Sequence, residues 1–339
     1  MVWLRFFRPE CDSLFATRCS LLCLRAVLHP DVSTPDPIYT LADLATWSAP
    51  GTALAVLGHP IGHSLSPAMH NAALAEIARG QSKFANWRYH RFDVSPEDLP
   101  HALALFFKRG FHGLNLTVPH KVIAFEQVAS VANEARPIGA VNTLLRAGDS
   151  AGWEGRNTDG YGLATAVRES LGVDLAGASV ILLGAGGAAR AAAAECLQRH
   201  CVSLWIANRT PARLEALLGL LQPLAAGVTV RGFNPQSPSA GLPSGALVIN
   251  ATSAGLRTED PPPIDLARLP RPVGVFDMIY NPPQTPLLRQ AAALGVAQAN
   301  GLAMLAHQGA KSLEYWTGVL AERTAPVMLR AARAALSLT

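Results

Sequence analysis

The sequence predicts an α/β protein built from two units of strands and helices. Short apolar runs alternate along the chain with segments that carry helix-start and helix-stop signals, an order typical of parallel sheets covered by helices. A length of 339 residues suits two domains better than one. A glycine-rich turn at 184–187 marks the second unit. We therefore expect two α/β domains, with C-terminal helices that return to the first.

Composition excludes several classes of protein. Hydrophobic residues make up 50% of the chain and charged residues 15%, which is enough apolar material for two buried cores. The net charge of +4 is small and the basic residues are scattered, so we expect no nucleic-acid partner. No run approaches the roughly 18 apolar residues that cross a bilayer, so we expect no membrane partner. The spacing of the 5 cysteines fits neither a disulfide framework nor a zinc site, which favours a cytoplasmic location and no metal.

Residues 1–38 are expected to be an N-terminal extension outside the fold, without stable order. The apolar patches in it are interrupted by Arg5, Arg8, Arg18 and Arg25, so it lacks the unbroken core of a secretory signal. The segment 31–37, with its prolines, is typical of a linker. An organelle transit peptide and a start codon placed too far upstream are the alternatives.

The first domain is expected over residues 39–158. Ser66-Pro67 and Ser95-Pro96 each combine an N-cap with a proline suited to the first helical turn, and Gly110 suits a C-cap. These signals and the apolar runs predict helices over 39–47, 66–78, 96–109 and 120–129, strands over 52–57, 87–94 and 111–118, and a hairpin over 140–157 with its turn at 148–152.

The second domain is expected over residues 159–300. A helix over 160–171 ends at Gly172, and the buried strand 179–183 leads into the glycine-rich turn. Further strands are predicted at 202–207, 246–250 and 273–277, with helices between them. Because the remaining helices follow a completed sheet, residues 301–339 are expected to pack back onto the first domain.

Residues 179–190 combine a strand, a tight turn and a helix in the pattern G-x-G-x-x-A. Gly184 permits the turn, Gly186 lets the backbone approach a pyrophosphate, and Ala189 permits close packing of the helix. The N-terminus of that helix offers N–H groups to phosphates. Glycines also mark ordinary turns, but here the strand and the helix lie where the motif requires them. We therefore predict a Rossmann-type dinucleotide-binding domain.

The end of the next strand indicates which dinucleotide binds. An acidic residue there usually bonds the ribose hydroxyls of NAD, whereas this chain has Asn208-Arg209-Thr210 and then Arg213. Arginine suits the additional 2′-phosphate of NADP. Solvated surface arginines are the alternative, and we expect NADP.

Further segments carry polar side chains at predicted strand ends and helix starts. They are the segments 59–67, 115–121, 139–143 and 157–160. Each has a purely structural explanation, since Ser66 and Asp159 can cap helices, Lys121 can be a solvated amine and Asn142 can fill a turn.

Taken together, these segments resemble the shikimate dehydrogenase family. The matching segments are HPIGHSLSP, NLTVPHK, GAVNT, NTDG, GAGGAAR, NRTPAR, NATSAG, FDMIY and NGLAMLAHQGA. They occur in the family's order over about residues 52–315, which is nearly the whole chain outside the extension. His59 departs from the asparagine that is common in the family.

The resemblance implies an NADP-dependent dehydrogenase that reduces 3-dehydroshikimate to shikimate, in the shikimate pathway of aromatic amino acid biosynthesis. It implies Lys121 and Asp159 as the catalytic pair. The implied substrate-binding residues are Ser64, Ser66, Thr117, Lys121, Asn142, Asp159, Tyr280 and Gln308. The implied cofactor-binding residues are Gly184, Ala185, Gly186, Gly187, Ala188, Asn208, Arg209, Thr210, Arg213, Met278 and Gly301.

These residue types suit the implied chemistry. A lysine ammonium can stabilise and protonate the oxygen of a ketone that receives a hydride, and a neighbouring carboxylate can orient that lysine. Two other functions stay open, namely a quinate/shikimate dehydrogenase of broader specificity and a non-catalytic dinucleotide-sensing protein. Both a monomer and a homodimer are compatible with the sequence.

Overall fold

The computed structural model of the chain describes residues 37–147, 152–238, 241–257 and 259–337. Of the extension predicted for residues 1–38, residues 1–36 therefore lie outside the described part of the chain. At its end the prediction needs a correction, because Ile38 already pairs with Arg91 in a sheet. The predicted turn at 148–152 lies almost entirely outside the described residues.

The first sheet has seven strands in the order β1-β3-β2-β4-β6-β7-β5. The strands are β1 Ile38–Tyr39, β2 Thr52–Gly58, β3 Trp87–Asp93, β4 Gly113–Leu116, β5 Ser130–Val131, β6 Thr143–Arg146 and β7 Trp153–Arg156. Strand β6 is antiparallel to both β4 and β7. The predicted hairpin is thus present, but it makes the sheet mixed rather than purely parallel.

Helices α1 Leu41–Ala45, α2 Ser66–Gly80, α3 Leu99–Lys108 and α4 His120–Phe125 belong to this part of the chain, with short 3-10 turns at Ser82–Phe84 and Arg136–Ile138. One predicted cap and one predicted helix start were wrong. Ser66 is the first residue of α2, whose N-cap is Leu65, and no side chain caps this helix. Helix α3 begins at Leu99, and in the turn before it the Ser95 hydroxyl accepts a hydrogen bond from Asp98 N (3.2 Å).

The second sheet has six parallel strands in the order β10-β9-β8-β11-β12-β13. They are β8 Ser179–Leu183, β9 Ser203–Ala207, β10 Thr229–Phe233, β11 Leu247–Asn250, β12 Gly274–Asp277 and β13 Ala297–Asn300. The helices are α5 Asp159–Leu171, α6 Gly187–Gln198, α7 Pro211–Leu221 and α8 Pro286–Ala293. The edge strands β10 and β13 were not predicted. Between β11 and β12, the described residues form only the 3-10 turn Leu266–Arg268 instead of the predicted helix.

Both faces of the first sheet are buried. Along β2, Leu54 and Val56 belong to one apolar cluster, which includes side chains of the C-terminal helices, while Ala55 and Leu57 belong to another with α3. This alternation follows from the opposite directions of successive side chains in a strand.

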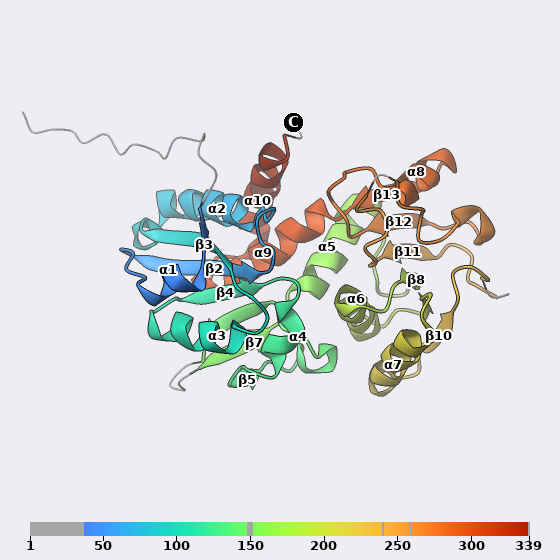
Figure 1. Cartoon of the computed structure of the whole chain (residues 1–339). Helices are drawn as coiled ribbons and strands as arrows, with labels where there is room; N and C mark the ends of the chain where they lie inside the picture. The colour runs from blue at the N-terminus through green and yellow to red at the C-terminus, as the bar shows by residue number, and fades with distance from the viewer. Residues whose placement is uncertain (1–36, 148–151, 239–240, 258, 338–339) are drawn as a thin grey trace, which may run out of the picture. The chain divides into compact units, whose positions relative to one another are not determined.

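The chain ends in helices α9 Leu302–Thr317 and α10 Ala321–Ala335. Helix α9 packs against α5 and α10, and α10 packs against α2 of the first sheet (Figure 1). Gly113 in β4 leaves the space that the ring of Trp316 occupies, and Trp316 Nε1 donates to the Leu144 carbonyl (3.1 Å). The exact domain boundaries stay a prediction. One domain is predicted over residues 39–158 together with 301–339, and the other over residues 159–300. Within the described residues, no helix has both the length and the apolar character needed to cross a membrane.

Candidate active site

A cavity of about 380 Å³ lies beyond the carboxyl end of β4, and its walls include side chains of α5, α6 and α9. Of the residues predicted for the site, those that line this cavity are Ser64, Ser66, Thr117, Lys121, Asp159, Ala188, Met278, Tyr280, Gly301 and Gln308. Asn142 lies behind the wall, hydrogen-bonded to Asp159. Outside the cavity lining are Gly184, Ala185, Gly186, Gly187, Asn208, Arg209, Thr210 and Arg213.

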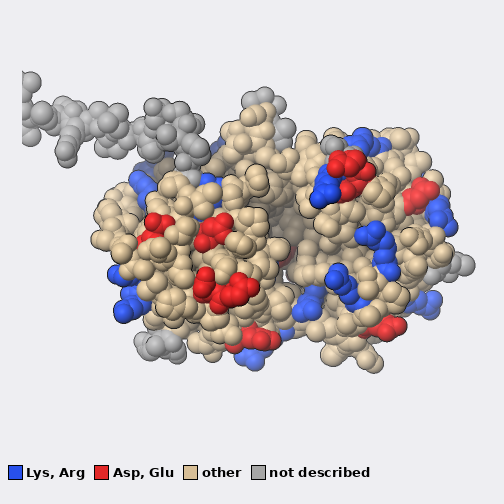
Figure 2. All heavy atoms as spheres, in the orientation of Figure 1, with Lys and Arg blue, Asp and Glu red and all other residues tan. Residues whose placement is uncertain are grey.

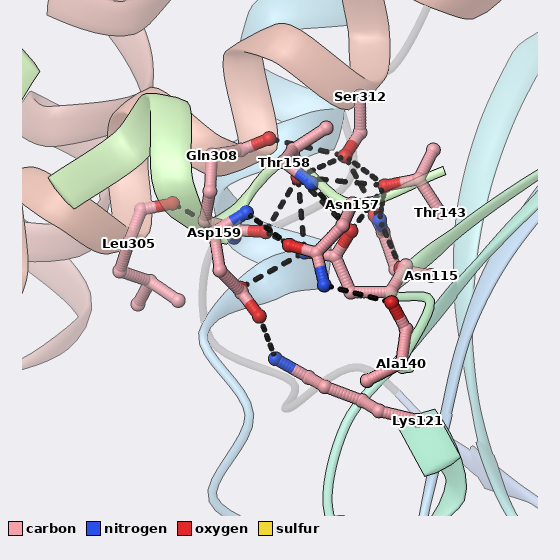
Figure 3. Close-up of polar contacts among 11 residues, drawn as sticks. Asn115, Lys121, Ala140, Thr143, Asn157, Thr158, Asp159, Leu305, Gln308 and Ser312 are labelled. Carbon is pink, nitrogen blue, oxygen red and sulfur yellow. Dashed lines mark hydrogen bonds and ion pairs between the residues drawn. The ribbon is translucent and has the colours of Figure 1, made fainter. Parts of the chain in front are cut away.

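Lys121 and Asp159 form an ion pair in this cavity (Figure 3). Lys121 Nζ donates to Asp159 Oδ2 at 2.7 Å, and the two side chains are 28% and 12% exposed. Asp159 is the first residue of α5, where the helix dipole favours a negative charge. The N-cap of α5 is Thr158 and no side chain caps this helix, so the carboxylate does not serve as a cap. Lys121 is therefore no solvated surface amine.

Asn142 fixes the second oxygen of Asp159. Its Nδ2 donates to Asp159 Oδ1 at 2.9 Å and lies 3.3 Å from Gln308 Oε1. Its Oδ1 accepts from the backbone N–H of Thr158 at 2.9 Å. With 1% of its surface exposed, Asn142 is a buried hydrogen-bonding residue and not a turn filler.

A buried tyrosine and asparagine extend these contacts toward α2. Tyr89 Oη donates to Asn115 Oδ1 (2.8 Å), and Asn115 Nδ2 donates to the Asn142 carbonyl (3.0 Å). Burial raises the pKa of Tyr89 well above its usual value, so its hydroxyl keeps its proton. Asn115 also lines the cavity. It belongs to the segment 115–121 singled out in the sequence, but its role as a link between other side chains was not predicted.

Ser64 and Ser66 lie together at the start of α2. Ser64 Oγ accepts from Ser66 N at 3.3 Å. The Ser66 carbonyl is 2.9 Å from His70 Nδ1, and burial lowers the pKa of His70 to about 4, so the neutral ring donates from Nδ1. Because neither hydroxyl caps α2, both serines are available to a ligand in the cavity.

Met278, Tyr280 and Gly301 form a further part of the wall. A Cβ atom on Gly301 would collide with the Met278 carbonyl, so only glycine permits this approach of the chain ends of β12 and β13. Burial raises the pKa of Tyr280, which keeps its hydroxyl protonated.

The glycine-rich turn has the shape that a pyrophosphate requires. Gly184 has φ +112°, a value that favours glycine, and Gly186 is the N-cap of α6 with no side-chain cap. Cβ atoms on Gly186 and Gly187 would meet nothing within 4 Å, so the backbone there faces open space. The first N–H groups of α6 are thus suited to phosphate oxygens.

Arg209 and Arg213 are exposed beyond the end of β9, the strand beside β8. Asn208 Nδ2 donates to the Thr210 carbonyl (2.9 Å) and shapes this loop. One face of the molecule is hollowed near its middle, with Lys and Arg side chains beside the hollow (Figure 2). The exposed arginines fit a ligand with an additional phosphate.

A glycine-rich turn suited to a pyrophosphate in a six-stranded parallel sheet, next to a cavity with a lysine–aspartate pair, is typical of the class of NADP-dependent oxidoreductases. Comparisons with known proteins specify the family. The shikimate dehydrogenase substrate binding domain matches residues 56–144, and the shikimate 5'-dehydrogenase C-terminal domain matches residues 301–333.

Relatives match over most of the chain. Shikimate dehydrogenase (NADP(+)) of Magnetococcus marinus is 42% identical over 265 residues, which cover 78% of this chain and 90% of that protein. The protein of the same name from Symbiobacterium thermophilum is 42% identical over 298 residues, covering 86% of this chain and 97% of the relative. The chain belongs to the shikimate dehydrogenase family.

Solved structures agree with this. Shikimate 5-dehydrogenase from Thermus thermophilus, in complex with NADP(H) and shikimate, superimposes with a TM-score of 0.70 at 37% identity, covering 84% of this chain and 99% of that one. The 5-ketofructose reductase of Gluconobacter sp. strain CHM43 superimposes with a TM-score of 0.71 at 31% identity, covering 82% and 98%.

Proposed function

We propose that this protein is a shikimate dehydrogenase, which reduces 3-dehydroshikimate to shikimate reversibly with NADPH, in the shikimate pathway of aromatic amino acid biosynthesis. The observation that carries the proposal is the 2.7 Å ion pair of Lys121 and Asp159 in a cavity that also contains Ser64, Ser66 and Gln308. Membership of the family supports the choice of substrate.

Substrate binding follows from the donors in the cavity. Ser64 and Ser66 would donate their hydroxyl protons to the substrate carboxylate. The ring hydroxyls would be held by the remaining polar groups of the lining, namely Thr117, Asp159, Tyr280 and Gln308. Asn142, which lies behind the wall, would contribute by holding Asp159. The apolar wall of Ala191, Ala192, Leu163 and Met304 would exclude water from the reacting carbon.

NADP would be held by the second domain. The pyrophosphate would be bound by the backbone of Gly184, Ala185, Gly186, Gly187 and Ala188. The adenosine end with its 2′-phosphate would be bound by Asn208, Arg209, Thr210 and Arg213. Met278 and Gly301 would contact the nicotinamide side. NADPH, when bound, supplies the hydride.

Lys121 would be the proton donor. As the ketone carbon receives a hydride, its oxygen gains negative charge, and the Lys121 ammonium donates a proton from Nζ to that oxygen. The products are the alcohol and a neutral amine, which regains a proton from water. Asp159 accepts one Nζ–H bond (2.7 Å), and this contact aims the remaining N–H groups of Lys121.

One assay tests the proposal against its rivals. The purified protein is incubated with shikimate and NADP, and initial rates of NADPH formation are compared with those for quinate in place of shikimate and NAD in place of NADP. Reduction of 5-ketofructose by NADPH is measured as well, because a structural relative bears that activity in its name. We expect shikimate with NADP to give by far the highest kcat/KM. Comparable rates with quinate would favour the broader dehydrogenase, and no turnover at all would favour a sensor.

Location and oligomeric state stay predictions. Cys196 and Cys201 are buried free thiols. Burial raises the pKa of Cys201 to about 11, which keeps its thiol protonated and unreactive. We propose a cytoplasmic location, which fractionation of the producing cells would test. A homodimer is proposed alongside a monomer, and sedimentation velocity distinguishes them.

A further inference from the structure

Three buried hydroxyls lie behind the Lys121–Asp159 pair, on the side away from the cavity. They belong to Thr143, Thr158 and Ser312, and we call them the hydroxyl cluster (Figure 3). Ser312 Oγ is 2.7 Å from Thr143 Oγ1 and 3.2 Å from Thr158 Oγ1. The three residues come from β6, the start of α5 and the middle of α9, so the cluster joins three segments that are distant in the sequence.

The Thr158 N–H and the Thr143 hydroxyl together hold the oxygen of the Asn142 amide. Thr143 Oγ1 donates to Asn142 Oδ1 at 3.0 Å, and the Thr158 N–H donates to the same oxygen at 2.9 Å. A rotated amide would place its own N–H groups against the Thr158 N–H, which can only donate, whereas the Thr143 hydroxyl can donate or accept. The amide nitrogen must therefore face Asp159 Oδ1, which it does at 2.9 Å.

The cluster also ties in neighbouring parts of the site. Asn115 Nδ2 is within hydrogen-bond distance of Thr143 Oγ1 (3.1 Å) and Ser312 Oγ (2.9 Å). Ser312 Oγ is within 3.0 Å of the carbonyl of Gln308, one helical turn earlier in α9. Thr143 and Ser312 have no exposed surface, so water cannot replace a lost partner.

We propose that Thr143 and Ser312 are positioning residues of the reaction. Their hydroxyls hold the Asn142 amide toward Asp159, and the carboxylate so fixed aims the Lys121 ammonium at the substrate oxygen. The inference deepens the proposed dehydrogenase function and rests on it. Neither residue lines the cavity, so both act through Asn142 and Asp159 and not by contact with the substrate.

The test compares two exchanges at one position. Thr143→Val keeps the shape of the side chain and removes its hydroxyl, whereas Thr143→Ser keeps the hydroxyl and removes a methyl group. We expect Thr143→Val to lower kcat for shikimate oxidation about tenfold with the KM for NADP unchanged, which is the effect of about one buried hydrogen bond. Thr143→Ser should keep kcat within about twofold of the unaltered protein.

Thr324→Val is the matched control. Thr324 is as buried as the cluster, at 2% exposed, and its hydroxyl bonds the Ala321 carbonyl in α10, outside the site. This variant should keep the kcat of the unaltered protein. An equal loss of kcat in Thr143→Ser and Thr143→Val would overturn the proposal, because packing and not the hydroxyl would then be responsible. Should Thr143→Val not fold, Ser312→Ala takes its place with the same expected loss.

Crystal structures of the two Thr143 variants give a readout that does not depend on turnover. In Thr143→Val, the distance from Asn142 Nδ2 to Asp159 Oδ1 should exceed the hydrogen-bond limit of about 3.5 Å, while Thr143→Ser should keep the contact. An intact contact in Thr143→Val contradicts the positioning role, whatever the kcat. A different outcome is that the contact is lost in Thr143→Val but the unaltered protein does not oxidise shikimate. In that case Thr143 still positions Asn142 and Asp159, and the proposed function fails.

Discussion

At the scale of single residues, the Lys121–Asp159 pair differs from ion pairs on a protein surface. Both oxygens of Asp159 have a partner, Lys121 Nζ at 2.7 Å and Asn142 Nδ2 at 2.9 Å. The lysine side chain is 28% exposed, so it remains accessible from the cavity. An ammonium has three N–H groups and Asp159 takes one, which leaves donors for a ligand.

Lys121→Ala separates proton donation from binding and from folding. General acid catalysis typically contributes about 10²–10⁴-fold, so we expect kcat to fall at least about 10²-fold. Binding of shikimate and NADPH, measured by calorimetry, should change far less, and the melting temperature hardly at all. Lys108→Ala, which removes an exposed lysine at the end of α3, is the control and should keep full turnover. Near-normal turnover in folded Lys121→Ala would end the proposed mechanism.

Arg209 and Arg213 should determine the choice of cofactor. Hydrogen bonds to charged groups contribute roughly 1.5–3 kcal/mol, so replacing both arginines with glutamine should weaken NADP by about tenfold or more per residue. The Kd for NAD, which lacks the 2′-phosphate, should change little. Arg289→Gln, in α8 on the same domain, should leave both Kd values unchanged. Equal weakening of NAD and NADP would refute the assignment.

The resemblance in the sequence predicts the residues of the site, and ten of the predicted residues do line one cavity. It does not identify Thr143 and Ser312, although both lie in or beside the matching segments. Their role depends on hydrogen bonds between residues 169 positions apart. No local pattern of polarity contains that information.

At the scale of elements, strands β10 and β13 were not predicted and helix α3 begins later than predicted, for different reasons. Strand β10 is mostly exposed and β13 has the sequence AQAN, so neither shows the apolar run of a buried strand. Both are edge strands, which need less burial. Ser66-Pro67 opens α2 itself, whereas Ser95-Pro96 lies in a turn before α3, which begins only at Leu99.

Helices α5 and α9 cross closely at Gly162. A Cβ atom there would lie 2.8 Å from the Met304 carbonyl and 2.9 Å from Gln308 Cβ. We expect Gly162→Ala to destabilise the protein by about 1–3 kcal/mol, as overpacking does, and to raise the KM for shikimate because Gln308 is displaced. Thermal unfolding and steady-state kinetics measure the two effects.

Gly219→Ala is the matched control for this exchange. Gly219 lies within helix α7 and has nothing within 4 Å of its Cβ position. Alanine is better than glycine in a helix by about 0.5–1 kcal/mol, so this variant should be slightly more stable. If Gly162→Ala were as stable as Gly219→Ala, helices α5 and α9 could move apart at residue 162 without lowering the free energy of unfolding.

At the scale of the whole molecule, the first sheet brings the site together by an arrangement that local signals do not contain. The hairpin over 140–157 could be predicted, but its insertion beside β4 could not. That insertion pairs Asn115 with Thr143 and Thr143 with Arg156. Strands β4, β6 and β7 therefore lie side by side, which brings the segments before Lys121 and Asp159 close together in the sheet. Strand pairing of this kind is a long-range property of the chain.

The buried histidine His70 makes stability depend on pH. Burial lowers its pKa to about 4, and the ring is stacked on Tyr89 with centroids 4.0 Å apart. In the unfolded chain the same group titrates near 6.5, so between these values the unfolded state binds more protons and stability falls as the pH falls. We expect a loss of about 2 kcal/mol in the free energy of unfolding between pH 7 and pH 5 from this residue.

Urea denaturation at the two pH values checks this expectation. His70→Gln should reduce the difference between the two free energies of unfolding, whatever its effect on stability itself. His101→Gln removes an exposed histidine and should leave the difference unchanged. A pH dependence that is the same in all three proteins would mean that His70 is not the group responsible.

The last prediction concerns which residues near the N-terminus activity and stability require. Among the described residues, those that line the cavity lie between Val56 and Gln308, so we expect removal of residues 1–35 to leave kcat within about twofold and the melting temperature unchanged. Removing residues 1–39 also takes away strand β1. Its Tyr39 pairs with Phe92 and has its ring 5.0 Å from that of Trp47 and 5.3 Å from that of Phe92.

Aromatic pairs of this kind are worth about 0.5–1.5 kcal/mol each beyond the area they bury, so the longer deletion should lower the free energy of unfolding by at least about 1 kcal/mol. The melting temperature should fall by about 2–4 °C for each such kcal/mol. Turnover should persist at 25 °C in both proteins, because Tyr39 does not reach the cavity. A loss of turnover in the shorter deletion would show that residues before 36 contribute to the site. Equal melting temperatures for the two deletions would show that β1 adds nothing to the sheet, and the folded part would then begin at α1.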